Sequence, residues 1–189
     1  MPIQTGFVVH TAETAPEGSR PFLVGAKEQF GFVPAPMAKM ASSPTVLESF
    51  LSNLPIFEKS SLSPIEREVV VMAVSVYNGC HYCVPMHTAI LKRMDAPEDL
   101  INALRDGTRI GNPKLQALAE FTRRVLETRG HTGETALGAF FDAGFNQQSA
   151  LDVVLGVSVF TLTTYAIRMT DAKLDPAFEA FKWTPVSGR

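Results

Sequence analysis

Two thiols and an imidazole lie close together in one short stretch of this 189-residue chain. Cys80 and Cys83 are its only cysteines and form a Cys-x-x-Cys motif, and His87 follows four residues after the second. On a helix of about 3.6 residues per turn, positions i, i+3 and i+7 share one face, so the three side chains can meet at one point. A close cysteine pair beside a histidine is typical of thiol–disulfide chemistry.

A carboxylate precedes this motif at the start of a strongly apolar segment. Glu68 is followed by residues 69–76, whose apolar character on nearly every side predicts a buried helix. A carboxylate at the edge of such a helix needs a partner. A neutral His87 can accept a thiol proton through one ring nitrogen, and Glu68 is the best-placed partner for the other. We therefore expect Glu68 and His87 to form a proton relay.

Other interpretations of the cysteine pair remain open from the residues alone. A structural zinc site usually takes four ligands, often from a second Cys-x-x-Cys or a histidine pair. The other histidines are His10, His81 and His131, which are scattered through the chain. A zinc-binding module or two inert packing thiols are thus alternatives to redox chemistry, and we expect no metal.

The spacing Glu68-x11-Cys80-x2-Cys83-x3-His87 resembles the signature of the alkylhydroperoxidase D-like family, within the wider carboxymuconolactone decarboxylase superfamily. Further stretches are similar to the peroxidase-related branch of that family, namely Gly31 to Pro34, Ser43-Pro44, Leu62-Ser63 and Arg67-Glu68. The sequence departs from that branch at Ala35, Pro85 and Thr164.

The resemblance implies a thiol-dependent hydroperoxidase or disulfide reductase in which Glu68 and His87 act as a pair. It also implies that Cys83 attacks the peroxide and Cys80 resolves the product, although a place near a helix start would favour Cys80. A Cys80–Cys83 disulfide would form, and an external dithiol protein or small thiol would reduce it. Tyr82 and Phe32 are candidates to line the substrate pocket, and no further cofactor is expected.

Three rival functions remain besides this one. The superfamily includes a lactone decarboxylase, for which the thiols would be incidental, and the chain could instead be a non-catalytic redox sensor or the zinc module above. The resemblance further implies a homo-oligomer, a trimer or hexamer, which agrees with thirteen phenylalanines and several helices that are apolar around most of their circumference.

Composition limits the remaining possibilities. A chain of 189 residues with 46% apolar content predicts one domain with a sizeable core. A net charge of −2 gives no electrostatic support for a nucleic-acid or anionic-membrane partner. No secretory signal is expected in residues 1–5, and no run reaches the roughly 18 apolar residues of a membrane span. We expect a cytoplasmic protein, where such a cysteine pair cycles.

The start and stop signals of helices predict an all-α bundle of about seven or eight helices. Residues 1–25 are expected to form an N-terminal arm, and residues 26–189 a single domain with its redox core at 63–94. The segment 30–36 is expected to pack in extended form near the site. The predicted helices span 44–54, a second segment from the capping box at Ser63 to Asn78, a third from about Cys80, then 98–106, 113–128, 133–143 and 147–169. In the last of these, six residues have the spacing of a core face: Leu151, Val154, Leu155, Ser158, Leu162 and Tyr165.

Overall fold

The computed structural model describes residues 6–185. This part of the chain is all-helical and contains no strand, as predicted. Its elements, in chain order, are η1 (Glu17–Ser19), α1 (Arg20–Phe30), α2 (Ala35–Met40), α3 (Pro44–Glu58), α4 (Pro64–Tyr77), α5 (Cys83–Arg93), α6 (Glu98–Asp106), α7 (Pro113–Thr128), α8 (Glu134–Asp142), α9 (Gln147–Thr170) and η2 (Pro176–Phe181), where η marks a 3-10 helix.

Helix α4 is the centre of the bundle, and it carries Glu68. It contacts α5, α6, α7 and α9, and all of its residues from Val69 to Ser75 are buried. Its start follows the predicted capping box, because the Glu66 carboxylate accepts the Ser63 N–H at 2.8 Å while the Ser63 hydroxyl accepts the Glu66 N–H at 3.3 Å. This cap sets the register of the helix and hence the direction in which Glu68 points.

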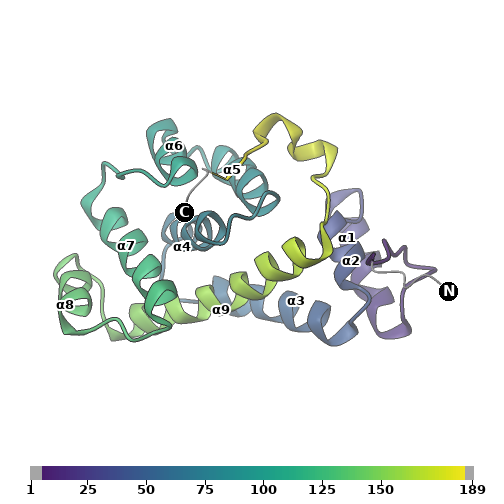
Figure 1. The fold of residues 1–189 in the computed structure, drawn as a ribbon, viewed down its shortest axis with the longest axis horizontal. Coiled ribbons are helices and arrows are strands. Elements are labelled where there is room, and N and C mark those ends of the chain that lie inside the picture. Colours follow the sequence, from purple (N-terminus) through teal and green to yellow (C-terminus); the bar gives the residue numbers. More distant parts are fainter. Residues whose placement is uncertain (1–5, 186–189) are drawn as a thin grey trace.

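Helix α9 runs along the molecule from α8 at one end to α1 and α2 at the other (Figure 1). Its length and composition would suffice to cross a membrane, a test that the core helix of a soluble protein also passes. Here it packs against α2, α3, α4 and α7.

The prediction of which α9 face is buried was wrong. Leu151 is 71% exposed and Tyr165 58% exposed, whereas the buried face consists of Val153, Gly156, Val159, Phe160, Thr163, Thr164 and Ile167. The threonines can be buried because their hydroxyls donate to carbonyls one turn back, as Thr164 does to Phe160 at 2.7 Å. At Gly156 an added Cβ would come within 2.8 Å of Phe57 and Val70, so the glycine permits close packing.

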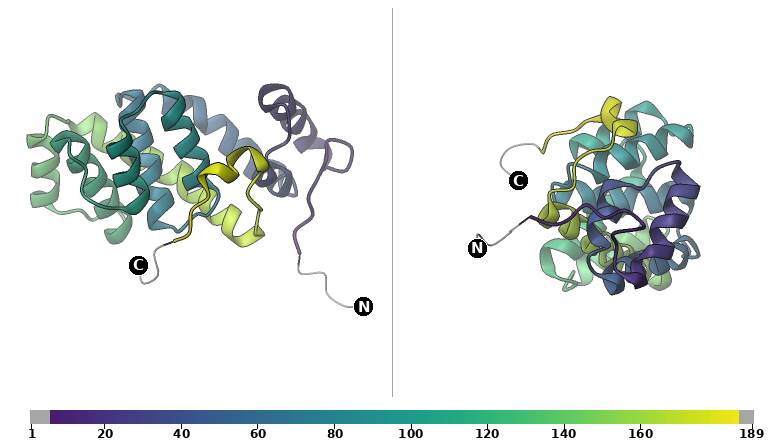
Figure 2. Two further views of the ribbon diagram at one scale, coloured as in Figure 1. Left: turned by 90° about the horizontal axis from the view of Figure 1, so that it is seen from above. Right: turned by 90° about the vertical axis from the view of Figure 1, so that its right-hand side faces the viewer.

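The N-terminal part contains more helix than predicted. The predicted arm 1–25 includes η1 and the start of α1, and residues 1–5 lie outside the described part. Helices α1 and α2 raise the count to nine α-helices in residues 6–185, against the seven or eight expected. Both start with a proline in the first turn, Pro21 and Pro36, where the missing N–H costs little. Both lie at one end of the molecule (Figure 2).

The segment 30–36 was therefore only partly predicted, because α2 begins at Ala35 inside it. Helices α1, α2 and the start of α3 enclose a second apolar cluster that includes Leu23, Met37 and Leu47. The remaining predicted helices are present, with α3 continuing past Leu54 to Glu58 and α5 beginning at Cys83 rather than near Cys80.

Candidate active site

The two cysteines lie in and after the tight turn that joins α4 to α5. Gly79 adopts a left-handed φ of +61° that reverses the chain. The Cys80 N–H then donates to the Ser75 carbonyl of α4 at 2.9 Å. Cys83 is the first residue of α5, and its N–H donates to the Cys80 sulfur at 3.2 Å. Cys80 thus precedes the helix, and it is placed where the first free amide of the helix can reach its sulfur.

Both cysteines are free thiols, and both are buried. Their Sγ atoms are hydrogen-bonded to each other at 2.8 Å, and the exposed fractions are 0% for Cys80 and 3% for Cys83. Disulfide formation therefore requires little movement of the backbone. Access for another molecule, in contrast, requires a change in whatever covers the pair.

The surroundings shift the pKa values of the two thiols in opposite directions. Burial alone would raise the pKa of Cys80, but hydrogen bonds from the Cys83 thiol and the backbone amides, together with charge on His87, outweigh burial and lower that pKa. Burial raises the pKa of Cys83 well above its ordinary value, and the neighbouring Cys80 raises it further. In the reduced pair, the negative charge is therefore favoured on Cys80.

Glu68 and His87 meet as the sequence predicted. His87 Nδ1 lies 2.9 Å from Glu68 Oε2, and the two side chains are only 6% and 13% exposed. The His87 ring also packs edge-on against Phe160 of α9, with ring centroids 5.5 Å apart. With Nδ1 bonded to the carboxylate, the other ring nitrogen is the one available to exchange a proton.

Tyr82 lies beside the thiols, where a pocket-lining role had been predicted. It is 2% exposed and shares an apolar cluster with Cys80 and Cys83. Its hydroxyl donates to Asp175 Oδ2 at 2.6 Å, and its ring packs edge-on against Phe178. Burial and the Asp175 carboxylate raise the Tyr82 pKa far above the ordinary value, so the hydroxyl stays a donor.

Asp175 belongs to a segment that covers the site, residues 172–185, which we call the C-terminal strap. It leaves the end of α9 and passes over to α5 (Figure 1). Asp175 Oδ2 also accepts the Ala35 N–H at 3.0 Å, and Leu174 and Phe178 pack against the thiol cluster. The strap therefore separates the two sulfurs from solvent.

Arg105 of α6 fastens the far end of the strap. Its guanidinium donates to the Thr88 hydroxyl at 2.8 Å and to the carbonyls of Phe181 and Lys182 at 3.0 and 3.1 Å. The Trp183 indole N–H donates a hydrogen bond to the Arg105 carbonyl at 3.0 Å. The strap is thus held by directed hydrogen bonds to Arg105 of α6, whose guanidinium is itself bonded to Thr88 of α5.

Phe32, the other residue predicted to line the substrate pocket, does not lie in the thiol cluster. Phe32 packs with Phe30, at a centroid distance of 6.5 Å, and none of the described contacts joins it to the sulfurs. Ala35 from the same stretch packs at the thiol cluster instead. Within residues 6–185, no three or more Cys, His, Asp or Glu side chains gather as a metal site.

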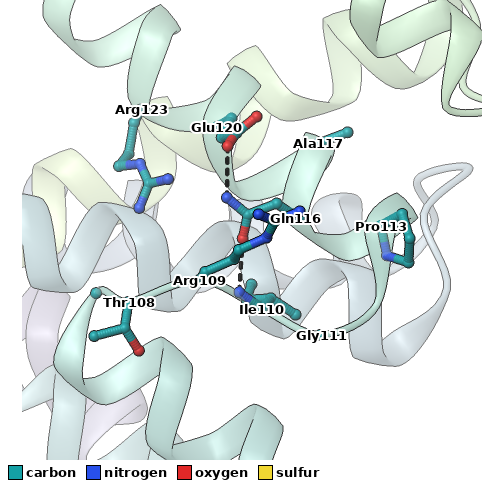
Figure 3. A pocket seen from close by; sticks show the side chains of 10 residues that line it. Thr108, Arg109, Ile110, Gly111, Pro113, Gln116, Ala117, Glu120 and Arg123 are labelled. Carbon is teal, nitrogen blue, oxygen red and sulfur yellow. Dashed lines mark hydrogen bonds between the residues drawn. The ribbon is translucent and has the colours of Figure 1, made fainter.

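A hollow of about 560 Å³ is also remote from this chemistry. It lies around the loop between α6 and α7 and is lined by Arg109, Gln116, Glu120 and Arg123 among others (Figure 3). Gln116 spans it by accepting the Ile110 N–H at 2.7 Å and donating to Glu120 at 2.5 Å. None of the thiol-site residues lines this hollow, so we place the active site at the cysteines.

Several residues at the site had not been predicted. Asp175 comes from a segment far along the chain and Arg105 from the next helix, α6, and only the fold brings them to the site. Arg168 of α9 donates to the Asn78 carbonyl at the end of α4, and Thr164, noted as a departure from the family pattern, accepts the Asn78 side-chain N–H at 2.9 Å. Only the polar type of Asn78 beside Gly79 could have indicated that this turn needs partners.

Part of the chain matches a known protein family. Residues 50–124 match the carboxymuconolactone decarboxylase family, a segment that contains Glu68, both cysteines and His87. A search of curated proteins finds no match.

Among solved structures, a peroxidase-related protein from Ralstonia eutropha JMP134, described as an alkylhydroperoxidase AhpD core, shares 22% identity with a TM-score of 0.80, over 91% of this chain and 93% of that one. A peroxidase-related protein from Silicibacter sp. TM1040 shares 19% identity with a TM-score of 0.77, over 96% and 98%. The debrominase Bmp8, in complex with 2,3,4-tribromopyrrole, shares 14% identity with a TM-score of 0.68, over 87% and 89%.

The predicted resemblance is thereby confirmed. The part of the chain that the structure describes has the alkylhydroperoxidase D-like fold, and the segment that carries the site matches the carboxymuconolactone decarboxylase family.

Proposed function

We propose that the protein is a thiol-dependent peroxidase that reduces hydroperoxides with its Cys80–Cys83 pair and is itself reduced by an external dithiol. The observation that carries this proposal is the pairing of two adjacent free thiols, one with a lowered pKa, with the Glu68–His87 hydrogen bond. A thiolate is the reactive form of cysteine toward peroxides, and a second thiol beside it allows the product to be resolved.

In the first step, His87 holds the proton that leaves the attacking thiol, and Glu68 stabilises the resulting imidazolium. The thiolate attacks the terminal oxygen of the hydroperoxide, an S–O bond forms and the O–O bond breaks. The attacking cysteine becomes a sulfenic acid, and the alkoxide takes the proton from His87 and leaves as an alcohol.

In the second step, the other thiol attacks the sulfenic sulfur, the S–O bond breaks, and water leaves. The two thiols are oxidised to a disulfide while the hydroperoxide is reduced to alcohol and water. A dithiol reductant then restores the pair by exchange, becoming a disulfide itself.

The order of attack is the point at which the family resemblance and the electrostatics differ. The resemblance implies that Cys83 attacks first. The lowered pKa of Cys80 and the raised pKa of Cys83 instead support Cys80 as the attacking sulfur, with Cys83 resolving. The amide that reaches Cys80 from the start of α5 supports the same order, which we adopt in this proposal.

Steady-state consumption of an organic hydroperoxide in the presence of a dithiol tests the function. We expect turnover that is abolished by Cys80→Ser and by Cys83→Ser. Disulfide formation without turnover would indicate a redox sensor, and stoichiometric bound zinc would indicate a zinc module. Decarboxylation of a carboxymuconolactone or bromide release from 2,3,4-tribromopyrrole, each retained in the cysteine variants, would likewise contradict the proposal.

We further propose that the protein acts as a homo-oligomer in the cytoplasm. The exposed apolar residues along α9 support an assembly of several copies, for which a trimer or hexamer is the form that the family resemblance implies. The reductant is either a dithiol protein or a small thiol.

A further inference from the structure

Ser75 has an unusual side chain for a residue in the last turn of a core helix. It lies on α4 with an exposed fraction of 0%, and its hydroxyl has no hydrogen-bond partner within residues 6–185. A buried hydroxyl without a partner loses its hydration without compensation, so such a group calls for a physical reason.

Several buried hydroxyls in this protein avoid that cost in the ordinary way, although Ser60 and Thr161 also have buried hydroxyls without a partner in the described residues. Thr88, Thr122 and Thr164 each donate to the carbonyl four residues earlier in their own helices, at 2.7, 2.8 and 2.7 Å. A serine in a helix can form the same bond. Ser75 does not, so its hydroxyl is directed elsewhere.

The cysteine pair is what lies next to Ser75. Its carbonyl accepts the Cys80 N–H at 2.9 Å, which ties the last turn of α4 to the thiol turn. The hydroxyl itself lowers the pKa of the Cys83 thiol, against the larger effect of burial, although it forms no hydrogen bond of ordinary geometry in the resting state. A negative charge on that sulfur would give the unpaired hydroxyl an acceptor.

We propose that the Ser75 hydroxyl is the donor that stabilises negative charge on Cys83 when this sulfur ionises to close the disulfide. This inference rests on the proposed peroxidase function and deepens it. Cys83 loses its proton and attacks the Cys80 sulfenic acid, the S–S bond forms, the S–O bond breaks, and the departing hydroxide takes a proton and leaves as water. Ser75 keeps its own proton throughout and gives its hydrogen bond only to the charged sulfur.

Such an arrangement favours the reaction because the interaction exists only once charge has formed. A donor that is unpaired in the neutral state and paired in the charged state lowers the barrier without stabilising the ground state. The hydroxyl would also act on the thiol that is harder to ionise, since burial and Cys80 both raise the pKa of Cys83.

The test measures the Cys83 thiolate directly and requires no turnover. Cys80→Ala leaves Cys83 as the only thiol, whose ionisation is followed by thiolate ultraviolet absorbance as a function of pH. Adding Ser75→Ala should raise the Cys83 pKa by about one pH unit, a roughly tenfold smaller thiolate fraction at a given pH. Ser60→Ala, which removes another buried hydroxyl without a partner in the described residues, is the matched control and should leave the pKa unchanged.

A second measurement uses the intact cysteine pair. After one equivalent of hydroperoxide, Ser75→Ala alone should close the disulfide about tenfold more slowly and show more labelling by a dimedone-type probe than the parent protein. Its reduced form should resist denaturant as well as the parent does, because no bond is lost. An unchanged Cys83 pKa in a folded Ser75→Ala protein would overturn the inference. A raised pKa in a protein without peroxidase activity would uphold it and reject the proposed function.

Discussion

Replacement of Glu68 by glutamine removes the charge from the proton relay and keeps the shape of the side chain. In the protein the carboxylate accepts the His87 Nδ1–H at 2.9 Å in a site where both side chains are largely buried. A hydrogen bond to a charged group contributes about 1.5–3 kcal/mol, against about 0.5–1.5 kcal/mol for a neutral one. The amide also permits the wrong ring tautomer, which removes the proton-accepting nitrogen from the thiols.

The combined effect on peroxide turnover should therefore be about 10²-fold, or ~2.7 kcal/mol in the barrier. The assay is the initial rate of hydroperoxide consumption with saturating dithiol, together with circular dichroism to show that the fold is retained. Unchanged turnover in a folded Glu68→Gln protein would refute the relay and leave Glu68 a purely structural residue.

Glu66→Gln is the matched control, because it makes the same substitution two residues earlier on α4. Burial opposes ionisation of Glu66, but its bonds to Lys114 and Ser63 outweigh burial and lower its pKa. A lowered folded pKa means that the carboxylate stabilises the fold at neutral pH, and that this stabilisation is lost as pH falls from about 4.3 through the folded value. Glu66→Gln should cost about 1 kcal/mol of stability, flatten the acid limb of the stability curve and leave turnover intact.

Three further outcomes are expected. A dimedone-type probe should trap a sulfenic acid in Cys83→Ser but not in Cys80→Ser, and labelling confined to Cys80→Ser would restore the order that the resemblance implies. Asp175→Asn weakens the bond that holds the strap to the thiol cluster, so alkylation of the reduced protein should become about tenfold faster, and an unchanged rate would mean that the strap does not limit access. Light scattering should give a mass above 20.6 kDa at micromolar concentration, reduced by Leu151→Asp or Met169→Asp on the exposed face of α9, and a wild-type mass of 20.6 kDa would contradict the predicted assembly.

Much of the fold follows from local signals in the sequence. Serine and asparagine caps with proline at the first helical position mark the starts of α3, α4 and α7, and the structure places them there. The Asn78-Gly79 stop likewise predicts the turn that carries the thiols. Such signals act within a few residues, so they need no knowledge of the rest of the chain.

The wrong structural predictions concern segments whose sequence pattern is compatible with two structures. Helix α9 is apolar around most of its circumference, so periodicity alone does not select the buried face. The larger side chains were assigned to the core, yet the buried face uses Gly156 and threonines whose hydroxyls bond within the helix. Prolines in α1 and α2 suggested irregular chain because the sequence does not show that they occupy first turns.

The same distinction applies to the candidate site. Glu68, Cys80, Cys83 and His87 are close in sequence, so their meeting could be predicted from spacing and resemblance. Asp175 reaches Tyr82 across 93 positions, a contact that no local pattern reveals. Ser75 is visible in the sequence, but only its burial without a partner distinguishes it from an ordinary helix serine.

The central claim is that Cys80 and Cys83 form a redox pair that reduces a hydroperoxide. Thiol counting before and after one equivalent of an organic hydroperoxide, with peptide mass mapping of the product, tests it most directly. The account predicts a loss of both thiols, an intramolecular Cys80–Cys83 disulfide and one equivalent of alcohol. Retention of both free thiols, with the hydroperoxide unconsumed, would contradict it.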